Sequence, residues 1–573
     1  MNDYQLYLLA RQRIDQLQRI GHLHAEAMAL DHGPGVQRRL ADSLGALADW
    51  MRIPGLLRRP IAAAAVFTVF AVVVWAPAWA QAPARHDGDA KHHSDHDQQL
   101  DRELQHVLRK AGFTGRIDAA LESRLGRELD PRKIELGRLL FFDKILGLHS
   151  DNSCAGCHGP ANGFGDSQPI AIGVDNNNIV GPNRAGPRNQ RRSPSVSNTI
   201  FYPALMWTAR FTAPRDDPFD STRGFLFPPP ENTVFEPTLL ASQASLASTE
   251  LVEMAGFTGI RANPGSVNPR VFIFDDGDGQ ALPAPDPTSG FHNFPIQDAV
   301  QARLNAIPAY QALFSAAFNG GVPLPPGGIT ISMRRQAIAE FQSSLTAVDA
   351  PIDRFARGHT HAMTTREKHG ALLFFGKANC VACHAVAGQA NEMFSDFKNH
   401  RIGGPQLAPV FGVGTSNVIY DGPDENEDFG FEQTTGNQAD RYTFRTGPLR
   451  NLKVARAFFH NGAFGTIAAA IAHHLDVRAS LRNYDPRANG VPPDLTVSPF
   501  DGVLAAGIDP LVQRPIKLTK HEFEDLVAFV EDALFDKRVL DFCDEVPPSV
   551  PSGRPLQTFE GCQKARHPSH KQK

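Results

Sequence analysis

The sequence predicts a mainly helical protein made of two similar tandem domains with long irregular loops. Apolar residues recur at helical spacing, and no sustained two-residue alternation of the strand kind competes with them. A chain of 573 residues is too long for one compact domain. Its 48 glycines and 44 prolines imply many turns between the helices.

Composition excludes several classes of protein. Hydrophobic residues make up 42% of the chain, so it can bury real cores and is not disordered as a whole. The formal net charge of -4 lacks the basic surplus of a general nucleic-acid binder, so we expect no nucleic-acid partner. Six cysteines are too few for a disulfide-dense scaffold.

The N-terminal part is interpreted as export and linker segments. In residues 51–80, two arginines precede a charge-free apolar run, 61–80, which ends in the A-W-A pattern of a signal-peptide cleavage site. An uncleaved membrane anchor at 61–80 is the alternative, because about 20 apolar residues can span a bilayer. Residues 1–50 are an extension, which is not translated if Met51 is the start, and 81–99 form a His-rich linker. We therefore expect the bulk of the chain in the periplasm.

Two copies of the motif C-x-x-C-H carry the chemistry. This spacing is the signature of covalent c-type haem attachment, in which two thiols bond to the haem vinyl groups and the next histidine binds the iron. Zinc or a redox dithiol is the alternative for a cysteine pair, but a histidine directly after both pairs in an exported chain favours haem. The residues are Cys154, Cys157 and His158 in the first copy, and Cys380, Cys383 and His384 in the second.

The sequence around the motifs also repeats. LLFFDK at 139–144 precedes the first motif and LLFFGK at 372–377 precedes the second, each at the end of a helical stretch. Asp130 with Pro131 is a helix start for the first stretch, and Thr364 with Glu367 forms a capping box for the second. We therefore expect two cytochrome c-like haem domains, residues 100–335 and 336–540, and a Pro-rich tail, 541–573.

Three further local patterns predict structure. Ile338, Phe341, Leu345 and Val348 have the spacing of one helix face. In the tail, Cys543 and Cys562 can form a disulfide in an oxidising compartment, with free thiols as the alternative. From Thr466 a helix places His474 on one face with Ile467, Ala470 and Ile471, while His473 points elsewhere. His474 could bind the second haem iron, or it could be a surface histidine near a helix C-terminus.

The order of the motifs resembles the bacterial di-haem cytochrome c peroxidases and their relative MauG, the methylamine-utilisation di-haem enzyme. The resemblance covers roughly Glu135 to Phe535. Around the first motif it rests on ELGRLLFFD, SCAGCHGPANGFGD and RRSPS, and on Trp207 in an element similar to the family's F-W-D-G-R. It continues with Gln243, followed ten residues later by Glu253-Met254, and with FRTGPLRN and FHNG after the second motif.

The resemblance implies a role for each of these residues. Haem one, on His158, would be the peroxidatic centre, and Glu253 would take a proton from peroxide and return it to the departing oxygen. Gln243 would orient the peroxide. Haem two, on His384, would transfer electrons, with Trp207 as a relay between the haems. Without the resemblance, Glu253 is an ordinary surface acid and Trp207 an ordinary core aromatic residue.

The chain departs from the family at both haems. Typical peroxidases carry a histidine shortly after the proximal one, but here no histidine occurs between Val174 and His292, so we expect haem one to be open at rest. The sixth ligand of haem two is Met in the peroxidases and Tyr in MauG, and the aligned residue here is His474. Axial ligands set the potential, so bis-His ligation would lower that of haem two.

Two features leave alternatives open. The family's interdomain calcium site uses an asparagine where this chain has Arg192, and Thr446 and Pro448 could still offer carbonyl oxygens. A cation beside an arginine is unfavourable, so calcium is an alternative rather than an expectation. The insertion at 208–242 is rich in Pro and Phe, and it could narrow the peroxide pocket, form a partner site or be a surface loop.

The sequence thus predicts a periplasmic di-haem cytochrome c peroxidase. It would reduce hydrogen peroxide to water with electrons from a small redox protein, a cytochrome c or a cupredoxin, passed through haem two to haem one. The alternatives are an oxidase or oxygenase similar to MauG or the rubber oxygenases, and a non-enzymatic electron-transfer cytochrome. A passive carrier needs no distal acid, so Glu253 and Gln243 argue against the last. A homodimer is compatible with the sequence but not specified by it.

Overall fold

Short helices joined by long irregular segments make up the computed structural model, which describes residues 95–226, 235–244, 246–256, 259–262, 270–284, 293–409, 427–497 and 507–562. The predicted extension, the signal peptide or anchor, and most of the His-rich linker lie outside these residues, as does the end of the tail. Within the described residues, no helix is both long and apolar enough to cross a membrane.

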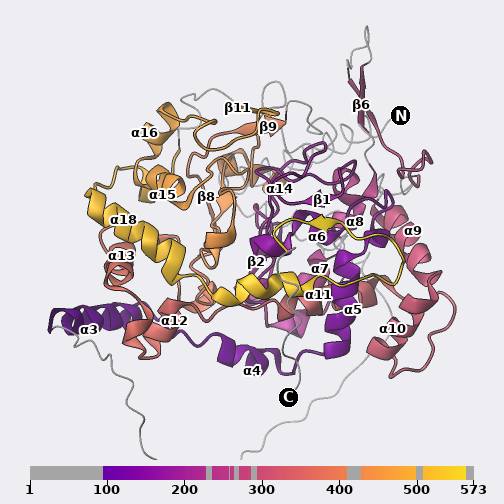
Figure 1. The fold of residues 1–573 in the computed structure, drawn as a ribbon, viewed down its shortest axis with the longest axis horizontal. Coiled ribbons are helices and arrows are strands. Elements are labelled where there is room, and N and C mark those ends of the chain that lie inside the picture. The colour runs from indigo at the N-terminus through magenta and orange to yellow at the C-terminus, as the bar shows by residue number, and fades with distance from the viewer. Residues whose placement is uncertain are drawn as a thin grey trace, which may run out of the picture. The chain divides into compact units, whose positions relative to one another are not determined.

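Helices dominate the described chain, as predicted (Figure 1). The α-helices are α3 (Asp95–Lys110), α4 (Leu121–Leu125), α5 (Pro131–Phe142), α6 (Cys154–Cys157), α7 (Leu239–Gln243), α8 (Leu246–Thr249), α9 (Asn293–Asn305), α10 (Pro308–Phe318), α11 (Ile331–Ser344), α12 (Pro351–Ala356), α13 (Thr365–Phe375), α14 (Glu432–Thr435), α15 (Ile467–Leu475), α16 (Val477–Arg482) and α18 (Lys520–Ala528). Single π-helical turns occur at Leu251–Ala255 and Phe529–Ala533.

The strands are short and form two-stranded pairs. They are β1 (Ile179–Val180), β2 (Ala204–Leu205), β3 (Phe211–Thr212), β4 (Phe225–Leu226), β5 (Phe235–Glu236), β6 (Gly259–Ala262), β7 (Arg270–Ile273), β8 (Asn399–His400), β9 (Leu407–Pro409), β10 (Phe444–Arg445), β11 (Leu495–Val497) and β12 (Thr558–Phe559). Antiparallel pairs join β2 to β3, β4 to β5, β6 to β7, β8 to β10 and β9 to β11. In contrast, β1 and β12 pair in parallel across most of the chain length.

The sequence repeat corresponds to a repeated helix packing. Helix α5 packs against α11 through Gly137, and α13 packs against α18 through Gly370. A Cβ atom at Gly137 would lie 1.9 Å from the Ala337 carbonyl oxygen, and one at Gly370 would lie 2.0 Å from that of Asp525. Each glycine begins the same run, G-x-L-L-F-F. Both halves therefore depend on the same close approach of two helix backbones.

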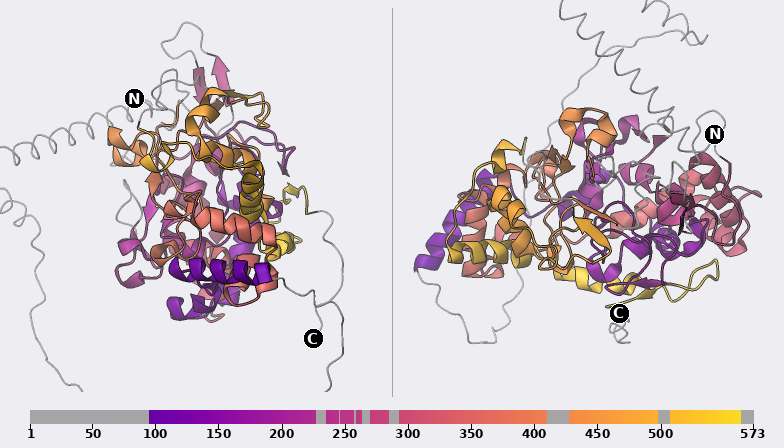
Figure 2. Two further views of the ribbon diagram at one scale, coloured as in Figure 1. Left: turned by 90° about the vertical axis from the view of Figure 1, so that its left-hand side faces the viewer. Right: turned by 90° about the horizontal axis from the view of Figure 1, so that it is seen from above.

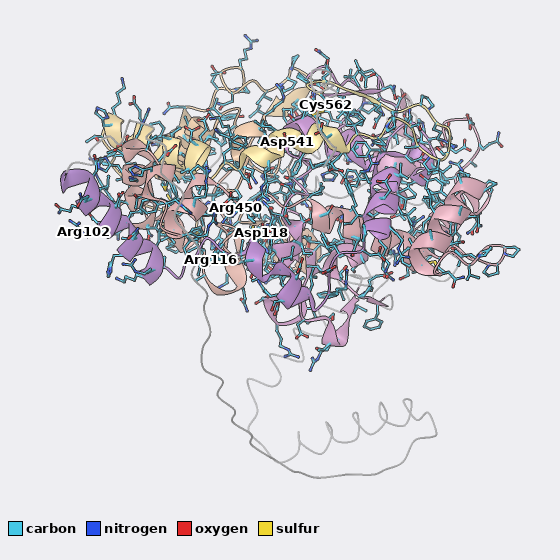
Figure 3. All side chains as sticks on the ribbon, turned by 60° about the horizontal axis from the view of Figure 1, so that its bottom comes forward. Arg102, Arg116, Asp118, Arg450, Asp541 and Cys562 are labelled. Carbon is cyan, nitrogen blue, oxygen red and sulfur yellow. A yellow bond between two sulfur atoms is a disulfide. The ribbon has the colours of Figure 1, made fainter. Side chains whose placement is uncertain are left out.

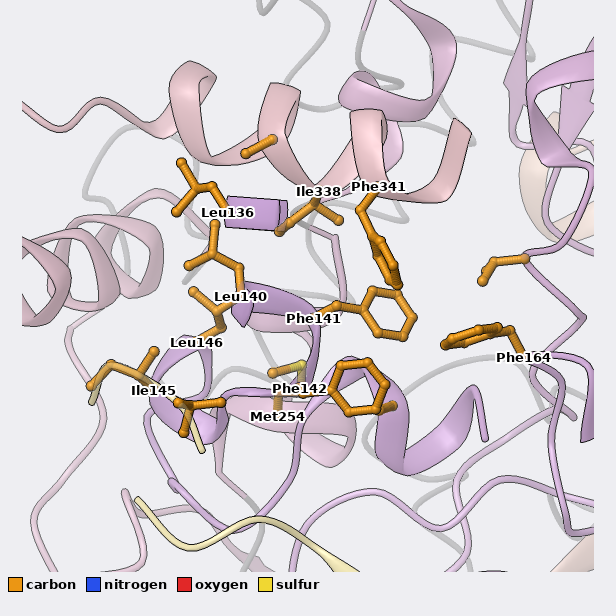
Figure 4. Packing of buried hydrophobic residues seen from close by; sticks show 14 of the residues in the cluster. Leu136, Leu140, Phe141, Phe142, Ile145, Leu146, Phe164, Met254, Ile338 and Phe341 are labelled. Carbon is orange, nitrogen blue, oxygen red and sulfur yellow. The ribbon is translucent and has the colours of Figure 1, made fainter. Parts of the chain in front are cut away.

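Two large hydrophobic clusters surround these helix pairs. In the first, Phe141 contacts Phe164 and Phe341 edge to face, with ring centroids 5.7 and 5.4 Å apart (Figure 4). In the second, Phe374 makes corresponding contacts with Phe394 and Phe529 at 5.8 and 5.2 Å. The phenylalanines of the repeated L-L-F-F run thus form the centre of each cluster.

Each end of the described chain packs in the hydrophobic cluster of the opposite half. Helix α3 packs beside α13 (Figures 1 and 2), and its Leu104 and Leu108 belong to the second cluster, although they precede the first haem motif. Conversely, Val539 and Phe559 belong to the first cluster. The described residues all fall in one compact unit, His93–Lys573. The division into domains at 335/336 therefore stays a prediction.

The capping signals are confirmed. The Asp130 side chain accepts a hydrogen bond from the Arg132 amide at the start of α5, and Thr364 with Glu367 forms the capping box of α13. The predicted helix face through Val348 is wrong at its end, because α11 stops at Ser344. Beyond it, Asn198 accepts from the Ala347 amide and donates to the Leu345 carbonyl, which draws the chain out of the helix.

Part of the insertion at 208–242 is buried in a hydrophobic core. Phe211 and Phe225 are buried with Leu239 and Leu240 of α7 in a third hydrophobic cluster. Phe235 on β5 is 64% exposed. Residues 227–234 lie outside the described part, so the role of the insertion in a pocket or partner site stays a prediction.

The C-terminal tail is fixed to the first half of the chain. A disulfide joins Cys543 to Cys562, the pairing considered from the sequence (Figure 3). Between these cysteines the chain runs past α5 to β12, where Thr558 pairs with Ile179 and Phe559 with Val180.

We expect Gly137→Ala and Gly370→Ala each to destabilise the protein. The added methyl group would force two helix backbones apart, and such overpacking costs about 1–3 kcal/mol. This outweighs the gain in helix propensity, about 1 kcal/mol. Thermal and urea unfolding of the holoproteins measure the effect. Glu135→Ala, on an exposed position of α5, is the control, and glycine variants as stable as that control would contradict the packing argument.

Candidate functional site

The histidines of the two C-x-x-C-H motifs are held in the same way. Nδ1 of His158 lies 2.9 Å from the Pro194 carbonyl oxygen, and Nδ1 of His384 lies 2.9 Å from that of Phe394. A carbonyl only accepts hydrogen bonds, so Nδ1 carries the proton in each ring. The lone pair is therefore on Nε2, which is the arrangement that metal-binding histidines adopt.

The surroundings of both histidines suit an iron ligand. Burial lowers the pKa of His158 and of His384 to about 4, so both rings are neutral at physiological pH. Phe141 lies 6.2 Å from the first ring and Phe374 lies 6.4 Å from the second. The four motif cysteines are not in disulfides, so their sulfur atoms are free to bond to haem.

A cavity beside the second motif is lined by His384 and by His474 of α15. The two ring centroids are 6.2 Å apart. Metal–nitrogen bonds are about 2 Å long, so this separation leaves room for one metal ion between the two rings. Nδ1 of His474 donates to the Ala470 carbonyl at 2.8 Å, which again leaves Nε2 available. The donor set therefore fits a haem iron bound on both sides by imidazole.

His473 has a different environment, as its position on the helix predicts. Its Nδ1 lies 3.0 Å from the Ser480 hydroxyl and its Nε2 lies 2.8 Å from the Ile402 carbonyl oxygen. Both ring nitrogens are engaged, and the side chain is fully buried. His473 is thus a structural histidine that holds α15 in place.

Trp207 is linked to both motifs. Its ring lines the same cavity as His384 and His474. Its Nε1 donates to the Arg192 carbonyl at 2.6 Å, and two residues further on the Pro194 carbonyl accepts from His158. A single segment of three residues therefore connects the indole ring to the first-motif imidazole through hydrogen bonds at both ends.

Glu253 lies on the π-helical turn Leu251–Ala255, beside the first motif. Gly173 permits the close approach, because a Cβ there would lie 2.0 Å from the Val252 carbonyl oxygen. The Asn152 amide donates to the Glu253 carbonyl at 2.9 Å and lies 3.8 Å from Cys157 Sγ. The sequence-predicted acid is therefore close to a haem-attachment cysteine.

The carboxyl group of Glu253 has an unusual environment. Burial, and next the charge of neighbouring Glu250, raises the pKa of Glu253 to about 8, although a hydrogen bond with Asn189 opposes this. Burial also raises the pKa of Glu250. Two nearby carboxyl groups that resist ionisation are typical of sites that transfer protons.

Gln243 lies near the residue that precedes Trp207. It ends α7, and its amide nitrogen lies 3.9 Å from the sulfur of Met206, the residue before Trp207. Among the described residues, no hydrogen bond joins Gln243 to Glu253. Its proposed contact with peroxide stays a prediction.

Thr446, one of the two residues considered for calcium, has surroundings that disfavour a cation, while the role of Pro448 stays a prediction. The Thr446 carbonyl accepts a hydrogen bond from the Ser395 hydroxyl at 2.8 Å and one from the Arg445 guanidinium at 3.2 Å. The buried Arg192 guanidinium donates to the backbone carbonyls of Asp166 and Gln168 nearby. Two guanidinium groups thus already bring positive charge to this region, and the described residues contain no group of three His, Cys, Asp or Glu that could hold a metal ion.

Several polar residues at both motifs were not predicted from the sequence. At the first, Asn152 and Asn189 hold Glu253. At the second, His400 lies between Asp396 and Asp509, at 2.9 and 2.6 Å, and lines the cavity. Hydrogen bonding to Asp396 raises the pKa of His400 to about 11, so it is a cation beside the haem-two site. The only sequence signal was the position of Asn152 just before the first motif.

Several known proteins are similar to this chain. Residues 131–361 match the family model described as di-haem cytochrome c peroxidase. MauG of Methylorubrum extorquens is 25% identical over 403 residues, which are 70% of this chain and 78% of MauG. Cytochrome c551 peroxidase of Pseudomonas aeruginosa is 25% identical over 352 residues, 61% of this chain and 72% of that protein. A solved MauG-like protein associated with microbial copper homeostasis is 20% identical, with a TM-score of 0.46, over 75% of this chain and 94% of that one.

Residues 131–361 belong to the di-haem cytochrome c peroxidase family, and over 70% of its length the chain is similar to MauG. It is accordingly a peroxidase-like oxidoreductase that binds two covalently attached c-type haems. The two C-x-x-C-H motifs supply the residue types that attach them.

Proposed function

We propose that this protein is a periplasmic peroxidase that reduces hydrogen peroxide with electrons from a small redox protein, a cytochrome c or a cupredoxin. The observation that carries the proposal is the half-buried Glu253 beside the first haem-attachment motif: its backbone carbonyl accepts from Asn152, which lies against Cys157, and its carboxyl group has a raised pKa. The overall reaction consumes one peroxide, two electrons and two protons and gives two waters. When bound, the first haem would bind peroxide and supply electrons to its oxygen–oxygen bond.

Glu253 would move the proton. As a carboxylate it accepts the proton of the oxygen that binds, and as an acid it returns this proton to the oxygen that leaves as water. A pKa of about 8 suits both steps near neutral pH, because neither form is strongly disfavoured. Asn189, which shares a hydrogen bond with the carboxyl group, would orient it.

The remaining residues would serve electron transfer. His158 and His384 would be the proximal ligands, and His474 would complete the coordination of the second iron. Trp207 would relay electrons, and the segment Arg192–Pro194 supports this role because it connects the indole to His158 by hydrogen bonds.

A MauG-like oxidase is the second candidate. It is favoured by the position of His474, because a nitrogen ligand in place of a methionine would lower the potential of haem two. Such a centre is a poorer acceptor of electrons from high-potential donors. Steady turnover of peroxide with a reduced cytochrome c or cupredoxin would favour the peroxidase over the MauG-like oxidase.

Glu253→Gln should lower kcat/KM for peroxide by about 10²–10⁴-fold, because the amide cannot accept and return a proton. In the wild-type protein, kcat/KM should rise with pH through about 8, as Glu253 loses its proton and becomes the base. This rise of kcat/KM with pH, the rising limb of the pH profile, should be absent in Glu253→Gln. Steady-state assays between pH 5 and 10 measure both effects.

Glu250→Gln is the matched control for that experiment. Removing the Glu250 charge lowers the pKa of Glu253, so the rising limb should move to lower pH while turnover is retained. A Glu253→Gln protein with wild-type kcat/KM and an unchanged pH profile would contradict the role of Glu253.

Trp207→Phe should slow turnover by about tenfold or more while donor-driven reduction of haem two stays normal. The variant loses the Nε1 donor to Arg192 and replaces the indole with a ring that is much harder to oxidise. Stopped-flow spectra can separate the reduction of haem two from its reoxidation by peroxide. Tyr202→Phe, which lines the same cavity, is the control. Equal reoxidation rates in wild type and Trp207→Phe would exclude the relay.

His474→Met should raise the potential of haem two, since axial ligands shift haem potentials within a range of about 0.8 V. A redox titration followed by visible spectroscopy measures the change. Ala472→Ser, at an exposed position of the same helix, should leave the potential near that of the wild type. Unchanged spectra and potential in His474→Met would show that another residue binds this iron.

A further inference from the structure

The C-terminal strap, residues 546–562, crosses the protein next to the first haem motif. The disulfide Cys543–Cys562 closes it into a loop (Figure 3). Strand β12 fixes it in parallel to β1, where the Thr558 amide donates to the Asn178 carbonyl at 2.9 Å and the Glu560 amide donates to that of Val180 at 2.8 Å. The last residues of the strap are thus held twice, by the pairing of β12 with β1 and by the disulfide at Cys562.

One strap side chain reaches the motif itself. Gln557 is 4% exposed, and its Oε1 accepts from the Ser153 hydroxyl at 2.9 Å while its Nε2 donates to Asn152 Oδ1 at 3.2 Å. Gly156, inside the first C-x-x-C-H, makes the space. A Cβ there would lie 1.9 Å from Asn152 Oδ1 and 3.0 Å from the Gln557 amide group.

Asn152 links the strap to Glu253. Its Oδ1 accepts from Gln557 and from Arg184, the latter at 2.9 Å, and these two donors fix the plane of its amide. Its Nδ2 then donates to the Glu253 carbonyl at 2.9 Å and faces Cys157 Sγ at 3.8 Å. Asn152 is 2% exposed, so water cannot replace a lost partner easily.

The position of the π-helical turn that carries Glu253 depends on hydrogen bonds from outside the turn, such as the one from Asn152. The Glu250 carbonyl accepts from the amides of Glu253, Met254 and Ala255, at 3.1, 3.2 and 3.1 Å, instead of from one amide as in a regular helix. A single π-helical turn of five residues has little stability of its own. Its position relative to Cys157 is therefore set by what it packs and bonds against.

We propose that the C-terminal strap is a positioning element for the acid/base residue. Gln557, acting through Asn152, holds the backbone of Glu253 at a fixed place beside the haem anchored on Cys157. The strap does not touch peroxide, and Gln557 is a positioning residue rather than a catalytic one. The proposal rests on the peroxidase function proposed for Glu253, and it makes the disulfide Cys543–Cys562 a requirement for full activity.

Gln557→Met tests the proposal in the full-length holoprotein. Methionine keeps the length of the side chain and removes both hydrogen bonds, and small displacements of catalytic groups cost up to about a hundredfold in rate. We expect kcat for peroxide to fall about ten- to a hundredfold with little change in KM. The rising limb of the pH profile should shift to lower pH, because a loosened Glu253 gains access to water.

Hydrogen exchange provides a readout that does not need turnover. Amide exchange in residues 250–256, followed by mass spectrometry of the holoprotein, should be faster in Gln557→Met and in the double variant Cys543→Ser/Cys562→Ser. Thr558→Ala, an exposed position on the same strand, is the matched control and should match the wild type in rate, pH profile and exchange. The potential of haem two should be the same in all of these proteins.

The outcomes separate this proposal from the proposed function. Wild-type kcat, pH profile and exchange in Gln557→Met would overturn the role of the strap, even if the protein is a peroxidase. Absence of peroxide turnover in the wild type would overturn the peroxidase function, while faster exchange in Gln557→Met would still show that the strap holds the turn.

Discussion

The structure depends on one kind of interaction that occurs at both motifs: a neutral histidine donates Nδ1–H to a backbone carbonyl. This bond fixes the tautomer and orientation of His158 and His384 and leaves Nε2 free. The carbonyls come from segments that follow each motif, so the motif and the chain after it must be folded together. The repeated glycine and phenylalanine contacts of α5 and α13 then hold each arrangement against a partner helix.

The two halves differ in the groups that lie near the motif residues. At the second motif His474 faces His384 across the space for one metal ion. Beside the first motif lies the half-buried Glu253, whose carboxyl group has a pKa raised to about 8. A repeated helix packing thus supports two different environments. In the proposed function, one of them conducts electrons and the other breaks peroxide.

Local sequence alone predicted the helix starts and the helix face that carries His474. Helix starts at Asp130 and Thr364 follow from capping chemistry between neighbouring residues, and the face of α15 that carries His474 follows from helical periodicity. The end of α11 at Ser344 could not be predicted, because Asn198, far away in sequence, draws the chain out of the helix. Asn152, Asn189 and Gln557 could not be predicted either, because their contacts with Glu253 and the first motif join residues far apart in sequence. The family resemblance, not the residues themselves, singled out Glu253 and Trp207.

The central claim is that one iron keeps an open position beside Glu253 while the other is bound by two histidines. The electron paramagnetic resonance spectrum of the oxidised, resting holoprotein tests it most directly. The account predicts one high-spin ferric signal, from haem one, and one low-spin signal of the bis-histidine type, from haem two. Two low-spin signals, with both irons remaining six-coordinate after one-electron reduction, would contradict it.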